Sequence, residues 1–142
     1  NPLPWLADGE RPGPPCYCGK RGCVETFLSG PALAREFHDA AGKDASPADI
    51  AALAAAGDST ALATMETYEG RLARSLAGVI NVVDPDVIVL GGGLSNIERL
   101  YGNVPHLWEE WVFSEEVSTR LVPNRHGDSS GVRGAAWLWP EP

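Results

Sequence analysis

The stretch PCYCGKRGCVETFLSG, residues 15–30, contains all three cysteines of the 142-residue chain. Their spacing is C-x-C-x4-C, and Gly19 and Gly22 lie between them, where a tight loop needs backbone with positive φ. Three clustered thiolates and one further ligand are typical of a tetrahedral zinc site. Four protein ligands leave no open position for substrate, so the ion is expected to be structural and to stiffen the loop. The predicted zinc ligands are Cys16, Cys18 and Cys23.

The fourth zinc ligand is not evident beside the cysteines. His38, His106 and His126 are the histidines of the chain, and none stands at a short spacing from the cluster. A residue preceding Asn1 is therefore the expected source. Two other interpretations stay open: unliganded thiols, and a redox site, although the C-x-x-C redox motif is absent. An odd, clustered set of thiols favours metal binding in a reducing compartment, which predicts a cytoplasmic protein.

The composition is that of a globular protein. Apolar residues make up 44% and charged residues 21%, and the net charge is −8. This acidity argues against binding to nucleic acid or to an anionic membrane, and no apolar run is long enough to cross a bilayer. The chain begins with Asn1 in the Pro-rich stretch NPLPWL, so we expect it to be a piece of a longer protein.

Helix signals recur along the chain. A helix is expected after Ser29, a short Ala-rich helix over residues 46–57, and a long helix from Asp58 to Asp84. Apolar residues of the long helix fall at spacings of three, four and seven, which predicts one buried face. The residues of that face are Leu62, Met65, Leu72, Leu76, Val79, Ile80 and Val83. Residues 1–22, rich in Pro and Gly, are expected to be ordered only if other residues fix them.

Strand signals are fewer. Residues 87–90 are β-branched or aliphatic and predict a strand covered on both faces, and residues 117–122 predict a second strand. Two strands make a poor sheet alone, so further strands are expected from the rest of the protein. A helix broken near residues 102–105 is expected between the strands, capped by Ser95 or Asn96, and the chain is expected to end in a helix over 132–139.

A run of three glycines follows the first predicted strand. Glycines without a Cβ let backbone N–H groups approach a nucleotide closely, although a plain strand-to-helix turn is the commoner origin of such a run. No Gly-Lys-Ser/Thr follows, so the run is not a P-loop. The glycines are Gly91, Gly92 and Gly93.

The segment CYCGKRGCVETFLSGPAL resembles C-x-C-G-x-x-G-C-x-E-x-x-x-S-G, the hallmark of the ROK family of sugar kinases and repressors. NPLPW, DPDVIVLGGGLSN and HGDSSGVRGAAWLWP also look like bacterial ROK fructokinases of the manno(fructo)kinase type, so the resemblance covers nearly the whole chain. It implies an α/β fold, the C-terminal lobe of the actin-like ATPase (sugar kinase/Hsp70/actin, ribonuclease H-like) fold with a zinc-binding loop. It also implies a Gly-His pair directly before Asn1, whose His completes the zinc site.

The resemblance divides the chain by role. Residues 1–28 would form the zinc loop and the sugar-contact segment, and residues 29–142 the helices with the nucleotide-side strand and the glycine turn. Glu25 would contact the sugar, although a solvated or helix-capping glutamate is the plain alternative. Gly91 to Gly93 would border ATP.

The N-terminal lobe of the family, with its phosphate loop and general-base Asp, has no match in this chain. Asp128 has no feature that marks it as a replacement base, so no catalytic residue is assigned and the fragment alone is expected to be inactive. The whole protein is expected to be a homodimeric, ATP- and Mg²⁺-dependent hexose kinase, most closely a fructokinase acting on the 6-hydroxyl. The alternatives are a glucokinase or N-acetylhexosamine kinase, a ROK transcriptional repressor, and a binding-only module with structural zinc.

Overall fold

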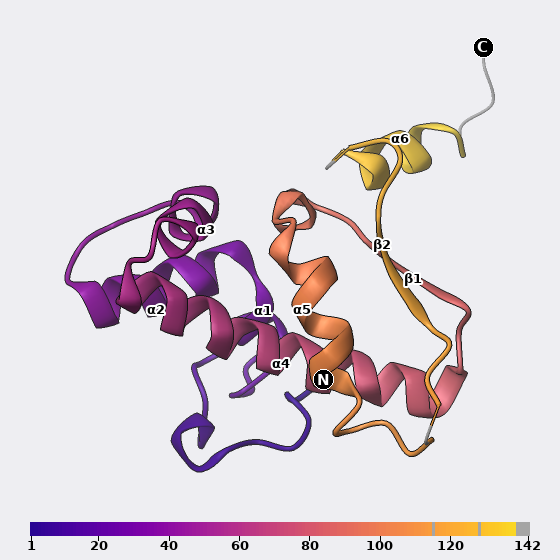
Figure 1. Ribbon diagram of the computed structural model, residues 1–142, viewed down its shortest axis with the longest axis horizontal. Coiled ribbons are helices and arrows are strands. Elements are labelled where there is room, and N and C mark those ends of the chain that lie inside the picture. Colours follow the sequence, from indigo (N-terminus) through magenta and orange to yellow (C-terminus); the bar gives the residue numbers. More distant parts are fainter. Residues whose placement is uncertain (115, 128, 139–142) are drawn as a thin grey trace.

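The computed structural model describes residues 1–114, 116–127 and 129–138, and one long helix organises it (Figure 1). This helix, α4 (Ser59–Val83), packs against α2 (Gly30–Ala41), α3 (Pro47–Ala55) and α5 (Arg99–Trp108). A small parallel sheet lies near the C-terminal end of α4. Asp128 and residue 139, the end of the last predicted helix, lie outside the described residues. No helix in the described ranges is both long and apolar enough to cross a membrane.

The three helices predicted after Ser29, Ser46 and Asp58 begin at these caps, and the long helix ends at Asp84 as predicted. Ser29 Oγ accepts a hydrogen bond from the backbone N–H of Ala32 at 3.3 Å, and Asp58 Oδ1 accepts one from Ala61 at 2.9 Å. Each bond satisfies a backbone donor that the first helical turn leaves without an intrahelical partner. Asp84, with φ of 47°, ends the long helix before Pro85. The elements are α1 (Glu25–Leu28), α2 (Gly30–Ala41), α3 (Pro47–Ala55) and α4.

The buried face of α4 differs in part from the prediction. Met65, Leu72 and Ile80 are buried as predicted, but Val79 and Val83 are 44% and 64% exposed. Small side chains occupy the centre of the interface instead, because they let the neighbouring helices approach closely. These residues are Ala61, Ala73 and Ala77. Trp108, Phe37 and Leu33 fill the space between the helices and are almost fully buried.

The sheet has two parallel strands, β1 (Val87–Leu90) and β2 (Arg120–Pro123), with Val87 opposite Arg120. The prediction that residues 87–90 are covered on both faces is wrong for this chain. Ile88 and Leu90 pack against the core, whereas Val87 and Val89 are 36% and 57% exposed. The physical reason is that the described helices cover one face of the strand only.

The segment after β1 departs from the prediction at two points. A short 3₁₀ helix, η2 (Gly93–Asn96), comes first, and α5 (Arg99–Trp108) begins after Glu98, so neither Ser95 nor Asn96 caps it. Ser95 Oγ donates instead to the carbonyl of Gly92 at 2.6 Å. The predicted break near residues 102–105 is absent, because the buried face of α5 packs on α4 and outweighs the lost hydrogen bond of Pro105. The last helix, α6, spans Ser130–Ala136.

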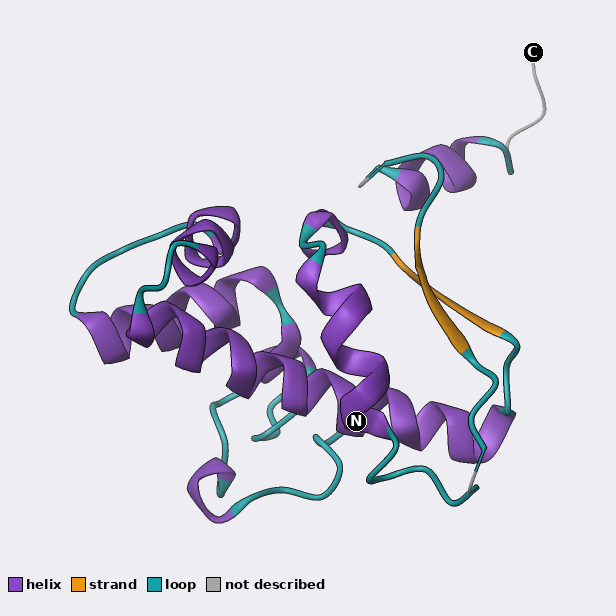
Figure 2. Ribbon diagram, in the orientation of Figure 1, coloured by secondary structure: helices purple, strands orange, loops and turns teal. Residues whose placement is uncertain are grey.

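The first 24 residues are mostly loop, apart from the 3₁₀ helix η1 (Asp8–Glu10), as Figure 2 shows. Their order comes from contacts with other parts of the chain. Pro2 pairs with Cys23 and Pro15 with Arg21 in isolated antiparallel bridges, and Leu3 donates from its backbone N–H to the carbonyl of Gly22 at 3.0 Å. The start of the chain therefore lies beside the last cysteine.

Candidate functional site

The three cysteines lie together in the structure. Their sulfur atoms are all within 4.8 Å of one another, and the Sγ atoms of Cys18 and Cys23 are 3.6 Å apart. A tetrahedral ion with Zn–S bonds of about 2.3 Å holds its sulfurs about 3.8 Å apart, so the cluster has the right dimensions for zinc. No histidine or carboxylate joins the cluster among the described residues. Three of the four ligands of the predicted site are thus brought together.

Backbone conformation shapes this thiol loop, which comprises residues 13–23. Gly19 and Gly22 both have positive φ, as predicted, and the backbone N–H of Cys16 donates to the carbonyl of Lys20 at 2.8 Å. Gly13 and Gly22 touch directly: a Cβ on Gly13 would lie 2.4 Å from the Cα of Gly22. The two arms of the loop are therefore pinched together at a point where no side chain fits.

The thiols differ in acidity. The backbone hydrogen bond from Lys20, with those from Cys16 and Cys23, lowers the pKa of Cys18. Hydrogen bonding to Cys18 and Cys16, together with burial, raises the pKa of Cys23 to about 11. Zinc binding needs cysteine ligands as thiolates, so an ion entering the cluster would displace the proton that Cys23 retains.

Glu25 follows the cluster by two residues and is the first residue of α1. Its side chain is exposed, and it makes no hydrogen bond or ion pair to any residue that the structure describes. Phe27, two residues further, is buried on the opposite side of this short helix. The Glu25 carboxylate therefore points to solvent, while the buried Phe27 anchors the opposite side of α1. Glu25 does not cap a helix among the described residues.

A buried ion cluster fixes the loop to α4, and the sequence analysis did not single it out. Glu10, in η1, is 7% exposed and lies between two arginines of α4. Arg74 grips both of its carboxylate oxygens, at 2.7 and 3.0 Å, and Arg71 Nε donates to Glu10 Oε1 at 2.8 Å. Arg74 also donates to the carbonyl of Trp5. The sequence did contain one signal for this cluster. Arg71 and Arg74 lie three positions apart, beside Tyr68 and Leu72, in a helix whose face is otherwise apolar.

The acidity of Glu10 reflects these contacts. Burial by itself would raise the pKa of Glu10, but the hydrogen bonds from Arg74 and Arg71 and from the backbone N–H of Ala7 outweigh it. The net effect lowers the pKa from 4.5 to about 2. The folded protein therefore holds Glu10 as a carboxylate.

The glycine turn lines a groove of about 520 Å³. Gly30 and Pro31 at the start of α2, and Ser46, Pro47 and Ala48 at the start of α3, form the other walls. A Cβ on any of the three glycines would meet no atom within 4 Å, and only Gly92, at φ 78°, needs a backbone that other residues rarely adopt. The N-termini of α2 and α3 thus border the turn, and their helix dipoles favour an anion such as phosphate. The glycines in question are Gly91, Gly92 and Gly93.

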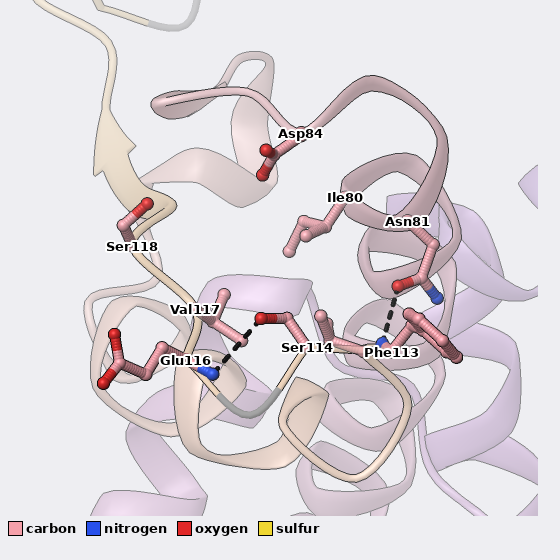
Figure 3. A pocket seen from close by; sticks show the side chains of 9 residues that line it. Ile80, Asn81, Asp84, Phe113, Ser114, Glu116, Val117 and Ser118 are labelled. Carbon is pink, nitrogen blue, oxygen red and sulfur yellow. Dashed lines mark hydrogen bonds between the residues drawn. The ribbon is translucent and has the colours of Figure 1, made fainter.

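Another hollow, of about 300 Å³, lies between the end of α4 and the loop after α5 (Figure 3). Its walls include Ile80, Asp84 and Val117, and none of the predicted site residues lines it. Asn81 fixes the loop there by accepting from the backbone N–H of Phe113 at 2.8 Å and donating to the carbonyl of Trp111 at 2.9 Å. These polar groups have structural roles.

Known proteins provide an independent comparison. Residues 6–142 match the ROK family. An N-acetyl-D-glucosamine kinase from Vibrio vulnificus is 37% identical over 123 residues, which cover 87% of this chain and 41% of that protein. The chain thus spans less than half the length of this relative.

Solved structures give the fold. A ROK family glucokinase from Streptomyces griseus, in complex with glucose and AMPPNP, superposes with a TM-score of 0.79 at 24% identity, over 89% of this chain and 47% of that one. A ROK family transcriptional regulator, a homologue of the E. coli MLC protein, superposes at 0.74 with 26% identity, over 90% and 35% of the two chains. The chain therefore has the α/β, actin-like ATPase-type fold of these proteins. The similarity extends to both an enzyme and a regulator.

The zinc prediction is tested by removing one ligand. Cys18→Ser should lower the bound zinc from about one ion per chain to well below half, because a hydroxyl is a far weaker zinc ligand than a thiolate. Elemental mass spectrometry of the purified complete protein measures this. Tyr17→Phe, between two cysteines and 91% exposed, is the matched control and should keep the zinc. Full zinc content in the Cys18 variant would contradict the assignment.

The ion cluster predicts a pH dependence of stability. Because folding lowers the pKa of Glu10 from 4.5 to about 2, its contribution is present above pH 4.5 and is lost as the pH falls from 4.5 to 2. That shift corresponds to about 3 kcal/mol in the free energy of unfolding. Glu10→Gln should remove this contribution at pH 7 and flatten the acid limb of urea unfolding, measured by circular dichroism. Glu109→Gln, at an exposed position, should change stability by no more than about 0.5 kcal/mol. Equal acid limbs for Glu10→Gln and wild type would refute the argument.

Proposed function

The chain belongs to the ROK family, and from that premise we propose that it is the C-terminal part of an ATP-dependent hexose kinase. The observation that carries the proposal is the spacing of the two candidate sites. Glu25 begins α1 and Gly30 lines the glycine groove, and the helix between them is four residues long. Four helical residues span about 6 Å and only Ser29 separates α1 from Gly30, so one short segment of the chain carries both the exposed carboxylate and a wall of the anion-attracting groove. A phosphoryl acceptor and a phosphoryl donor need such proximity.

The proposed sugar is an aldohexose, and in particular N-acetyl-D-glucosamine. The curated relatives include N-acetyl-D-glucosamine kinases from several bacteria, and one structural neighbour is a glucokinase with bound glucose. These similarities favour the alternative substrates of the sequence analysis over fructose, its first expectation. The 6-hydroxyl as acceptor, a cytoplasmic location and a homodimer stay predictions.

In the proposed mechanism, the residues of this chain bind and orient the substrates. The Glu25 carboxylate accepts hydrogen bonds from two adjacent sugar hydroxyls, and such charge-assisted bonds are stronger than neutral ones. The backbone N–H groups of the glycine turn and the positive dipole ends of α2 and α3 face the nucleotide phosphates. Mg²⁺ would neutralise charge on the transferred phosphoryl group. The general base is expected outside this chain.

Zinc is proposed as a structural ion of the thiol loop, with a histidine preceding Asn1 as the fourth ligand. Two contacts place the start of the chain beside the cysteine cluster. The carbonyl of Asn1 accepts from the backbone N–H of Val24 at 2.9 Å, and Pro2 pairs with Cys23. A residue just before Asn1 would therefore lie close to the buried thiol.

A regulator is the second candidate, favoured by the structural similarity to the MLC homologue. That similarity is confined to the part of the fold that this chain represents, and the net charge of −8 is unfavourable for binding DNA. A regulator would have to carry its DNA-binding part elsewhere in the polypeptide.

Substrate turnover separates these candidates. The complete polypeptide with ATP and Mg²⁺ should phosphorylate N-acetyl-D-glucosamine or glucose with a higher kcat/KM than fructose, measured by coupled ADP release. Glu25→Gln should raise the sugar KM about tenfold, because a neutral amide makes weaker hydrogen bonds to hydroxyls, and should leave the KM for ATP unchanged. Glu66→Gln, an exposed glutamate of α4, is the control. Absence of turnover with every hexose would refute the kinase, and an unaltered sugar KM would remove Glu25 from the site.

The glycine turn is tested best at Gly91. Its backbone has no positive φ and a Cβ there meets no atom, so Gly91→Val should fold normally and intrude only on a bound nucleotide. The KM for ATP should rise about tenfold, with the sugar KM unchanged. Gly102→Val, at an equally open position on α5, is the control. Wild-type nucleotide affinity in the Gly91 variant would place the nucleotide elsewhere.

A further inference from the structure

Arg71 lies where four segments of the chain meet. From α4, its Nε donates to Glu10 of η1 at 2.8 Å, and its Nη1 donates to Glu36 of α2. Its guanidinium carbon lies 5.0 Å from the centre of the Phe27 ring in α1. The Arg71 side chain is only 11% exposed, so these contacts are shielded from solvent and from salt.

The helix that Arg71 covers cannot hold its own direction. α1 has four residues, and Val24 at its N-cap position makes no side-chain capping bond. A single helical turn is unstable without outside contacts. Neighbouring helices supply them: Tyr68 Oη donates to the carbonyl of Leu28 at 3.2 Å, and Arg35 donates to the carbonyl of Thr26 at 2.6 Å. Among these residues, Arg71 also binds Glu10, in the segment that leads into the thiol loop.

We propose that Arg71 is a positioning residue that sets the direction of α1 and thereby aims Glu25 at the sugar. This inference rests on the proposed role of Glu25. The guanidinium fork binds one carboxylate through Nε and a second through Nη1, while its face covers the Phe27 ring. A lysine ammonium is a compact point charge and cannot make these three contacts together. A positive charge at position 71 is therefore not enough to hold α1 in place; the shape of the guanidinium group is also needed.

The structure offers a matched control on the other side of the same helix. Glu69 of α4 is 2% exposed and is bound by Arg99 of α5 through Nε and, at 3.2 Å, through Nη2. That pair is also a buried arginine–carboxylate contact to α4, but in the described part of the chain the hydrogen bonds of the Arg99 side chain go to Glu69 and not to α1. Arg99→Lys should thus weaken the fold without turning Glu25.

The experiment compares Arg71→Lys with Arg99→Lys in the complete polypeptide. Hydrogen–deuterium exchange of residues 23–29 should be faster in Arg71→Lys than in wild type and unchanged in Arg99→Lys. In the kinase assay, Arg71→Lys should raise the sugar KM about tenfold, with kcat and the KM for ATP within about twofold of wild type. Glu36→Gln, which removes only the α2 partner, should give a smaller change of the same sign and serves if Arg71→Lys does not fold.

The exchange and kinetic results test three separate points: whether Arg71 directs α1, whether this affects Glu25, and whether the protein is a kinase. Unchanged exchange of residues 23–29 in the Arg71 and Glu36 variants, or an equal rise in Arg99→Lys, would overturn the inference. Faster exchange with an unaltered sugar KM would overturn the link to Glu25. If the wild-type protein phosphorylates no hexose, the proposed function fails, while the exchange comparison still decides whether Arg71 directs α1.

Discussion

The pairing of Glu10 with Arg71 and Arg74 is the constraint on which the thiol loop and α1, with its proposed sugar-binding residue Glu25, depend. The first 24 residues contain few apolar side chains that reach the core, and their own backbone bonds join them mainly to one another. The ion cluster links this segment to the longest helix of the chain. Because the carboxylate is gripped at both oxygens and is largely buried, breaking it would leave charged groups without partners, which is costly. The thiol loop and α1 take their position from this attachment.

The thiol cluster and the ion cluster act on different parts of this region. The three sulfurs close the loop on itself, and Glu10 fixes the closed loop to α4. Neither contact alone would direct the residue that follows Cys23. Because a single helical turn has almost no intrinsic stability, α1, which carries the proposed sugar-binding carboxylate, needs such external supports.

Local chemistry made much of this structure predictable. Caps at Ser29, Ser46 and Asp58 and the Asp84–Pro85 stop are short-range signals, and the structure has each helix boundary there. The thiol cluster was predictable for the same reason, since its three ligands lie within eight residues. The family resemblance added the expected roles of Glu25 and of the glycines, which geometry supports without testing.

Long-range features were the ones that the sequence did not reveal. Glu10 and Arg74 are 64 positions apart, and nothing local marks them as partners. Exposure of Val89 depends on which elements lie over the strand, and the continuity of α5 through Pro105 depends on its packing against α4. In α4, the predicted stripe contained only large apolar residues, whereas the buried face also includes alanines, which the close packing of neighbouring helices accommodates.

The pinch at Gly13 and Gly22 has a consequence for how this region tolerates change. At the pinch there is no room for even a methyl group on Gly13, so a side chain there would force the two arms of the loop apart. Beyond it, Tyr17 stands almost wholly in solvent at the tip. Substitution is therefore tolerated better at Tyr17 than at the pinch, and a spectroscopic label at the tip would report on the cysteines that flank it.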